Sequence, residues 1–439
     1  MNKSSGKCQT NFCVICVKMF AFNLKNVLIV FLWIDYLWVQ YLRARQHKKV
    51  KISNGLSKEC NEALPKESFD KCKAQALQRN RLAFVKDFVS IITTTTVIQS
   101  KILPKIWDET DPLGELDEIT RSCMWYFFFT TFLAFINLPF TIYDSVIFES
   151  NQNPEFLIWK QLKNFVVGQV FAVMLCSLLV TIIKNGDEVF ISVWILFCLV
   201  VFIVGVSYPQ MAPSKYRHLS PLKPGNLRNE ITNLAVTLDF PLKEIYIEER
   251  FSNKSCSNIY FYGRPHQKSI VILNTLILKE HGIGCTNNQI LALVSFEFAR
   301  WHFKESFKYV MVLEANLLLS FLAFFVLFKH PQIYEIFGFV NFHPVLVGVY
   351  VVLKYVMVPY ASLLSFGFMW VSRRFVMQND EFVAKLGKGK ALIEALIRVE
   401  ENNGKFPVCD RLYSMWHNEK PCLMERIEAI ERIEEEKFE

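Results

Sequence analysis

The sequence lacks several features that would assign a protein class directly. It has no internal repeat and no low-complexity tract, so a repeat array is excluded. Its 12 cysteines are scattered, and the only C-x-x-C, from Cys13 to Cys16 with Cys8 before it, has no second pair to complete a metal or redox site. We expect this group to belong to a plain N-terminal segment that is open to palmitoylation.

We also expect neither a cleavable signal peptide nor a nucleic-acid-binding surface. The first apolar run extends to full membrane-spanning length and contains Asp35, unlike the short apolar core of a signal peptide. The net charge is +8, but the placement of the lysines and arginines is explained by membrane topology. We therefore expect no nucleic acid among the partners.

Apolar and aromatic residues are abundant instead. The chain is 52% hydrophobic and 15% aromatic and contains 40 Phe. These residues lie in long runs that are typical of membrane spans, so membrane lipid is the first expected partner. Seven spans are predicted, at 26–42, 87–106, 122–142, 165–183, 189–207, 309–328 and 344–370. The second is weak because it contains four consecutive threonines at 93–96.

Charge placement predicts the orientation of these spans. A basic cluster directly follows the first span and comprises Arg43, Arg45, Lys48, Lys49 and Lys51. By the positive-inside rule this loop is cytosolic, and counting spans places 143–164, 208–307 and 371–439 in the cytosol as well. Four late cysteines are then expected on the reducing side, namely Cys256, Cys285, Cys409 and Cys422.

The predicted organisation has five segments. A loosely ordered N-terminal tail (1–25) precedes spans one to five (26–207), which include a basic cytosolic loop (43–86). A cytosolic α+β segment (208–307) is followed by spans six and seven (308–370). A cytosolic helical segment (371–439) then completes the same domain.

Hydrophobic periodicity predicts the elements of the two late cytosolic segments. In 208–307 we expect a helix at 229–238, strands at 244–248, 259–262 and 269–273, and a second helix that starts near residue 289. In 371–439 we expect a helix to Leu386, a break at Gly387 and Gly389, and further helices at 391–400 and 424–438.

The second helix of the α+β segment carries an incomplete catalytic motif. Residues 296–300 read Phe-Glu-Phe-Ala-Arg, which is His-Glu-x-x-His without either histidine. A zinc hydrolase needs two imidazoles one helical turn apart to hold the metal, with the glutamate between them as the base for the metal-bound water. Phe296 cannot ligate a cation, and Arg300 brings a positive charge. The zinc chemistry has either been lost or moved elsewhere.

Motifs along most of the chain identify a family. They lie at 36–46, 138–143, 240–243, 257–263, 385–387, 406–408 and 414–417. Together they resemble the type I CAAX prenyl proteases, which are zinc endopeptidases of the endoplasmic reticulum membrane that cleave farnesylated proteins. The resemblance implies a mostly α, multipass membrane protein with about seven helices around a chamber and a small cytosolic α+β metalloprotease-like domain. It also implies the endoplasmic reticulum membrane as the location, with a cytosolic C-terminus.

The resemblance also implies where the zinc-site residues of the family fall in this chain. The two helix histidines fall on Phe296 and Arg300, the third ligand falls on Val376, and a histidine that stabilises the oxyanion falls on Lys420. The general base is retained as Glu297. Active members use zinc, but no cofactor is expected here, because all three ligand positions have lost their donors. We expect Glu297 to be idle and to form an ion pair with Arg300, three residues further along the helix.

Other family positions have structural interpretations. Asp380 is expected to pair with an arginine, with Arg373, Arg374 and Arg426 as candidates. A substrate groove along the second strand is a further hypothesis, with Asn258, Tyr260 and Tyr262 as its residues.

The leading functional hypothesis is a pseudoprotease. It would bind prenylated or CAAX-ended clients without cutting them, or would regulate an active relative. The alternative is an active zinc metalloendopeptidase of CAAX-box protein processing with an unorthodox metal site built from His302, Glu305 and His417. However, His302 lies about 600° around the helix from Phe296, so it points away from the original position.

A transporter is a third hypothesis. It rests on charged residues in or near the spans, which are functional candidates in membrane proteins: Lys25, Asp35, Glu314 and Lys354. They are dispersed along the chain and outline no evident pathway.

Overall fold

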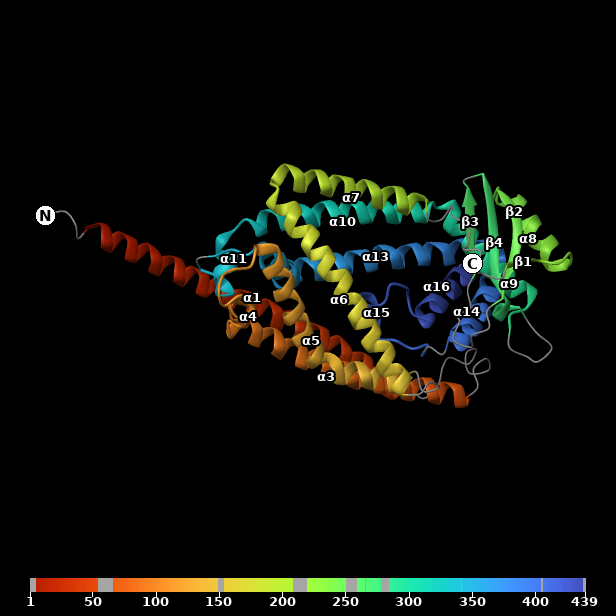
Figure 1. Cartoon of the computed structure of the whole chain (residues 1–439). Coiled ribbons are helices and arrows are strands. Elements are labelled where there is room, and N and C mark those ends of the chain that lie inside the picture. The colour runs from red at the N-terminus through yellow and green to blue at the C-terminus, as the bar shows by residue number, and fades with distance from the viewer. Residues whose placement is uncertain are drawn as a thin grey trace. The chain divides into compact units, whose positions relative to one another are not determined.

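The computed structural model describes residues 5–53, 66–148, 154–207, 219–249, 259–264, 266–277, 284–340, 342–403 and 406–436. Most of these residues are helical (Figure 1). The chain divides into two compact units. The first comprises Met1–Tyr41, Arg79–Phe197 and Leu317–Leu363, and the second comprises Leu42–Gln78, Cys198–Asn316 and Leu364–Glu439.

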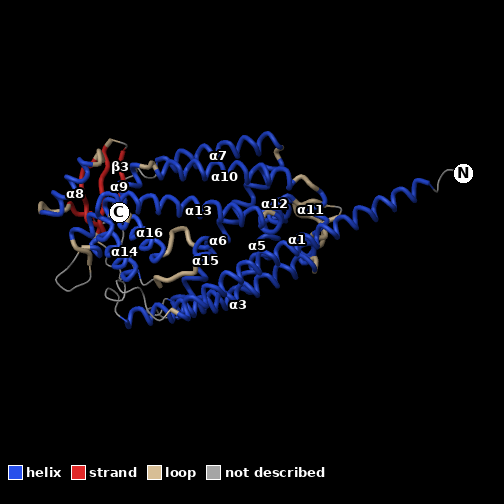
Figure 2. The backbone as a smooth tube through the Cα atoms, turned by 180° about the vertical axis from the view of Figure 1, so that it is seen from behind, coloured by secondary structure: helices blue, strands red, loops and turns tan. Residues whose placement is uncertain are grey.

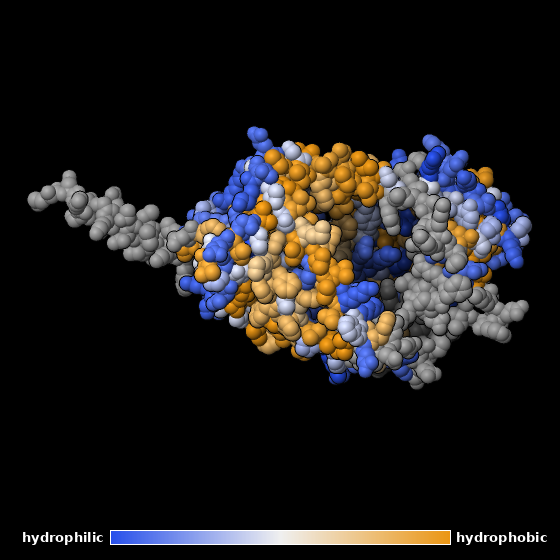
Figure 3. Space-filling model, viewed as in Figure 1, coloured by the Kyte–Doolittle hydropathy of each residue, from blue (hydrophilic) through white to orange (hydrophobic). Residues whose placement is uncertain are grey.

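Among the residues that the structure describes, six helices are long and apolar enough to cross a membrane, and a bent pair makes a seventh candidate. The six are α1 (Ser5–Ile52), α3 (Lys66–Gln99), α5 (Glu118–Phe148), α6 (Pro154–Lys184), α7 (Asp187–Ser207) and α10 (Glu305–Phe328). The seventh joins α12 (Val345–Val351) and a π-helical stretch (Val352–Val356) to α13 (Val358–Val383), with a 56° bend. Hydrophobic side chains gather over α6 and α7, as Figure 3 shows. The prediction of a mostly α, multipass membrane protein is confirmed.

Two boundaries differ from the sequence prediction. The second span was expected at 87–106, but its apolar stretch lies within Phe69–Gln99, and α4 (Ile102–Thr110) is separate. The hydroxyls of Thr93 and Thr95 donate to the carbonyls of Val89 and Ile91, so the threonine run stays helical. The tail 1–25 was expected to be loosely ordered, yet α1 begins at Ser5. The side chains of Cys8, Cys13 and Cys16 lie outside the described residues.

The first unit is held by aromatic and aliphatic packing between its helices. Trp125 and Phe129 of α5 are fully buried and stacked, with ring centroids 5.4 Å apart. The indole of Trp125 donates to the carbonyl of Leu103 in α4 over 3.1 Å, so its one polar atom is satisfied inside the core. Asp35, one of the intramembrane charges, accepts a hydrogen bond from the Ser362 hydroxyl over 2.9 Å.

The second unit contains a small mixed sheet in the order β1-β2-β4-β3. The strands are β1 (Leu219–Pro221), β2 (Leu242–Glu248), β3 (Ile259–Arg264) and β4 (Gln267–Leu273). The β2–β4 pair is parallel, and the β1–β2 and β3–β4 pairs are antiparallel. The three predicted strands are confirmed. β1 was missed because three residues that end in a proline give no alternation to detect.

Two helices pack against this sheet, α8 (Asn226–Thr237) and α9 (Asn287–His302), as Figure 2 shows from behind. Their shared core contains Ile231, Ile245, Ile270, Val294 and Phe298, all almost fully buried. This core fixes α9, the helix with the incomplete motif.

A second apolar core lies among the C-terminal helices α14 (Gly389–Asn403) and α16 (Leu423–Glu435). It includes Val383, Leu392, Ile427 and Ile430, and it also takes in Ala292 of α9. A π-helical turn, Ala384–Lys388, connects α13 to α14 where a break was predicted. The short helix α15 (Arg411–His417) was not predicted.

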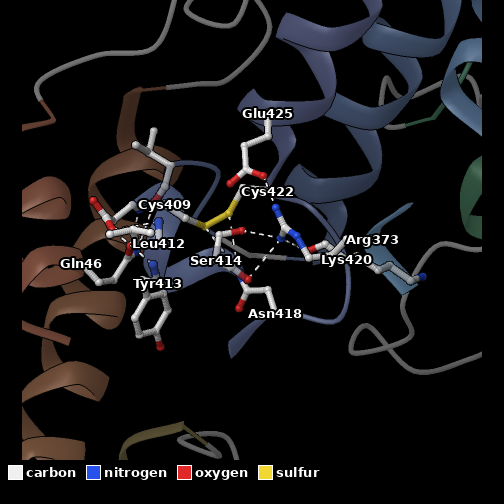
Figure 4. The surroundings of a disulfide bond; sticks show 12 residues. Gln46, Arg373, Cys409, Leu412, Tyr413, Ser414, Asn418, Lys420, Cys422 and Glu425 are labelled. Carbon is white, nitrogen blue, oxygen red and sulfur yellow. Dashed lines mark hydrogen bonds and ion pairs between the residues drawn. A yellow bond between two sulfur atoms is a disulfide. The ribbon is translucent and has the colours of Figure 1, made fainter. Parts of the chain in front are cut away.

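The structure pairs two of the cysteines that were predicted to lie on the reducing side, and that side stays a prediction. Cys409 and Cys422 form a disulfide with Cα atoms 6.2 Å apart (Figure 4). The reason is local: α15 and the turn after it fold back, so that the residue before Asp410 meets the residue that begins α16. Cys285 remains a free, buried thiol. Cys256 lies outside the described residues.

Gly387 provides a test of the α13–α14 connection. It has a φ of 75°, which L-residues adopt only with strain, and no atom lies within 4 Å of an added Cβ. We expect Gly387→Ala to lower the free energy of unfolding by about 1–2 kcal/mol through backbone strain alone. The matched control is Gly367→Ala in α13, where the space is also open and φ is not positive. A thermal unfolding series in detergent that ranks the two variants equally would contradict this expectation.

Candidate functional site

The helix α9 is set in place by its N-terminal cap. The Thr286 hydroxyl accepts from the Gln289 backbone, and the Thr286 backbone donates to the Gln289 side chain, which is a capping box. The Gln289 amide also donates to Glu394 of α14 over 2.9 Å. The cap and the two apolar cores fix where the residues of the incomplete motif lie.

Glu297 is buried, with 6% of its surface exposed, and it is bound by Arg300. One terminal nitrogen of Arg300 lies 3.0 Å from a Glu297 oxygen. The Nε of the same guanidinium donates to Glu305 over 3.1 Å, and Asn379 of α13 donates to that Glu305 oxygen over 3.0 Å. One cation thus pairs with two buried carboxylates and joins α9, α10 and α13.

Burial and charge act in opposite directions on this pair. Burial raises the pKa of the Glu297 carboxyl, and the Arg300 guanidinium opposes the rise. Glu297 in turn raises the pKa of Arg300, which therefore stays protonated. A carboxylate that accepts two hydrogen bonds from a fixed guanidinium is poorly placed to take a proton from water.

The neighbouring positions are filled by other contacts. The Arg426 guanidinium lies 5.1 Å from the Phe296 ring centroid and makes two hydrogen bonds to Asp380, of 2.8 and 2.6 Å. Of the three candidate arginines, Arg426 is therefore the partner that the structure gives to Asp380. Val376 is buried, with 5% of its surface exposed.

These residues do not fit a zinc ion. A phenyl ring, a guanidinium and an isopropyl group offer no lone pair to zinc, which takes imidazole, thiolate or carboxylate ligands. In the part of the chain that the structure describes, no group of three His, Cys, Asp or Glu residues is arranged to hold a metal.

The candidate replacement ligands have separate surroundings. The His302 ring lies 5.6 Å from Phe382, and the His417 ring lies 4.6 Å from Tyr413. Glu305 belongs to the Arg300 network. The sequence marked Glu305 only as a candidate metal ligand and did not mark Asn379. The sequence did hold a hint that Glu305 pairs with Arg300, because the two residues are only five positions apart. The chain turns between them at Lys304, which has a left-handed φ of 52° and joins α9 to α10.

A cavity of about 340 Å³ lies beside the network. Its apolar wall includes Ile259, Leu293 and Phe296, and its charged residues include Glu297, Arg300 and Lys420. The exposed Lys420 belongs to the turn before α16, and its carbonyl accepts from Arg373. The cavity therefore has an apolar side and a charged side.

The strand β3 meets this cavity through Ile259. Tyr260 donates its hydroxyl to Glu248 over 2.8 Å, and Tyr262 stacks on Tyr246 with ring centroids 6.4 Å apart. Because side chains alternate along a strand, both tyrosines lie on the opposite face from Ile259. Asn258 lies outside the described residues. The peptide groove along β3 stays a prediction.

Two families match successive parts of the chain. Residues 46–213 match the family described as CAAX prenyl protease N-terminal, five membrane helices, and residues 221–434 match peptidase family M48. The CAAX prenyl protease 1 homolog of Homo sapiens is 31% identical over 93% of this chain and 96% of its own length. The homolog of Taenia solium is 30% identical over 93% and 96%.

A solved structure shares the fold. The crystal structure of S. mikatae Ste24p aligns with a TM-score of 0.70 and 22% sequence identity, and the alignment covers 92% of this chain and 98% of that one.

The Arg300 network predicts a pH-dependent loss of stability. In Arg300→Met two buried carboxylates lose their cation, so we expect the free energy of unfolding to fall by about 3 kcal/mol, the low end for a buried pair because Arg300 is 35% exposed. The folded-state pKa of Glu297 then rises further. The loss therefore begins near the ordinary glutamate value of 4.5 and grows as the pH rises toward the folded-state pKa.

Thermal unfolding in detergent between pH 4 and 8 measures this effect. Adding Glu297→Gln to Arg300→Met should reduce the slope with pH. The control is Arg228→Met, which breaks the partly exposed pair with Glu244 and should cost less than about 1 kcal/mol. An Arg300→Met variant with wild-type stability throughout would contradict the network.

Proposed function

This chain belongs to the CAAX prenyl protease family of M48 peptidases, and we propose that it is a membrane-embedded pseudoprotease. In this proposal it has lost its zinc ligands and binds prenylated or CAAX-ended polypeptides without hydrolysing them, or regulates an active relative. The family membership and the multipass membrane fold are the premises; the loss of hydrolysis and the client are what is proposed.

The observation that carries the proposal is the position of the Arg300 guanidinium. It lies 3.0 Å from Glu297, the residue at the family's general-base position. A fixed cation there repels a second one, and Phe296 and Val376 supply no compensating ligand. In members that bind zinc, the ion supplies a Lewis acid and lowers the pKa of a bound water. In this chain the Glu297 carboxylate is instead paired with Arg300, so it is not available as the base for such a water.

Client binding is supported by what remains around the pair. The cavity of about 340 Å³ keeps an apolar wall, and it meets β3, which lies at the edge of the sheet. Extended peptides bind other proteins by adding a strand at a sheet edge, which is the mode of binding that we propose here. Binding without cleavage would let this chain compete with an active relative for the same polypeptides.

The location and orientation are also proposed. We infer the endoplasmic reticulum membrane, with 208–307 and 371–439 in the cytosol. The basic cluster after the first span supports this orientation. Arg45 of this cluster donates to Asp410 over 3.0 and 3.1 Å, which supports placing the end of α1 and the C-terminal segment on one side of the membrane. Two segments on the same side must be separated by an even number of spans. With seven predicted spans in all, six lie between the end of α1 and the C-terminal segment, in agreement with this condition.

Zinc content tests the loss of hydrolysis. We expect far less than one zinc per chain in the detergent-purified protein, measured by elemental mass spectrometry, and no cleavage of a farnesylated CAAX peptide. The matched variant restores the family ligands by Phe296→His, Arg300→His and Val376→Glu. It should bind more zinc than the wild type in the same preparation.

The opposite result would support the alternative hypothesis of an active zinc metalloendopeptidase. Near one zinc per wild-type chain, lost in His302→Ala or His417→Ala, would establish an unorthodox metal site and overturn the pseudoprotease proposal. Client binding is tested separately by fluorescence anisotropy of a farnesylated CAAX peptide, with the unfarnesylated peptide as control. Equal, weak binding of both peptides would reject the proposed client.

A further inference from the structure

The disulfide between Cys409 and Cys422 ties together the starts of two helices (Figure 4). Cys409 precedes Asp410, the N-cap residue of α15, and Cys422 is itself the N-cap residue of α16. The two cysteines are separated by 13 residues. The closed loop contains Lys420, which lines the cavity of the candidate site.

The Cys409 end of this loop is anchored to α1. The Arg45 guanidinium makes hydrogen bonds to both oxygens of Asp410, of 3.0 to 3.2 Å. The Gln46 side chain accepts from the backbone of Asp410 over 2.6 Å. Asp410 also caps α15 by accepting from Leu412 and Tyr413. This end of the loop is therefore fixed whether or not the disulfide is present.

The Cys422 end is anchored to α13 by Arg373. Its guanidinium donates to the Ser414 carbonyl over 3.2 Å, to the Ser414 hydroxyl over 2.8 Å and to the Lys420 carbonyl over 3.4 Å, and it pairs with Glu425. The contact with Lys420 is the longest of these hydrogen bonds. The disulfide, two residues further on, therefore supplements the weakest anchor of the cavity wall.

The two sulfur atoms are open to exchange. Both cysteines are partly exposed, and Asn418 donates to both sulfurs over 3.7 Å. Cys285 is the contrast in the same unit: it is 1% exposed, and burial raises the pKa of its thiol to about 11, so it is unreactive. A partly exposed disulfide on the cytosolic side of a membrane meets a reducing thiol pool.

We propose that Cys409 and Cys422 form a reversible thiol–disulfide switch that fixes the Lys420 wall of the candidate-site cavity. This proposal rests on the proposed function, because it assigns regulation to the same client-binding cavity. In the reduced state one cysteine, as its thiolate, attacks a low-molecular-weight disulfide and releases one small thiolate. The second cysteine then attacks the mixed disulfide and releases the other. The protein loses two electrons and two protons, and the small disulfide becomes two thiols.

The test uses the full-length protein in detergent, equilibrated with glutathione and glutathione disulfide at ratios from fully reduced to fully oxidised. Alkylation and mass spectrometry give the fraction of Cys409 and Cys422 that is bonded, and hydrogen exchange of 411–421 gives the order of the loop. We expect a reversible transition in the bonded fraction. Reduction should speed amide exchange in 411–421 by up to roughly 100-fold, the factor that closure of a loop of this length allows.

Two variants sharpen this test. Cys409→Ser/Cys422→Ser should exchange rapidly at every glutathione ratio, and Cys285→Ser should behave like the wild type. If the double variant does not fold, wild-type protein reduced and alkylated under native conditions replaces it. The switch is overturned if the two cysteines stay reduced in glutathione disulfide or stay bonded in excess glutathione. It is also overturned if amide hydrogen exchange of 411–421 is the same with and without the disulfide. None of these measurements needs zinc or a client, so their failure is distinct from failure of the proposed function.

Discussion

The α9–α10–α13 junction depends on one guanidinium that serves two buried carboxylates. Glu297 and Glu305 are 6% and 4% exposed, and each forms its ion pair with Arg300. Two uncompensated negative charges at this depth would be costly, because water does not solvate them. Arg300 is therefore a structural residue, although it stands at the last position of the incomplete motif.

Most of α9 is held by contacts outside the Glu297–Arg300 pair. Val294 and Phe298 pack against the sheet, and Ala292 packs against the C-terminal helices. These contacts supply the hydrophobic stabilisation of the helix and do not involve the motif residues Glu297 and Arg300. The packing of α9 and the chemistry of the motif are thus separable.

The sequence predicted the elements that have a periodic pattern and missed the contacts between residues that are far apart in the chain. The apolar runs gave the spans, and alternation gave β2, β3 and β4 within a few residues. The Glu297–Arg300 pair followed from helical spacing. By contrast, the Asn379 contact with Glu305 joins residues 74 apart. The Cys409–Cys422 bond depends on a fold-back around α15, and a seven-residue helix has too weak a periodic signal to be found.

The contact of Arg45 with Asp410 has a consequence for biosynthesis. The two residues are 365 positions apart, so the first membrane helix emerges long before its partner exists. During synthesis the basic end of α1 must remain solvated, and only the nearly finished chain can close this contact. A chain that ends before Asp410 therefore cannot form this contact, and Arg45 then lacks the partner that it has in the complete fold.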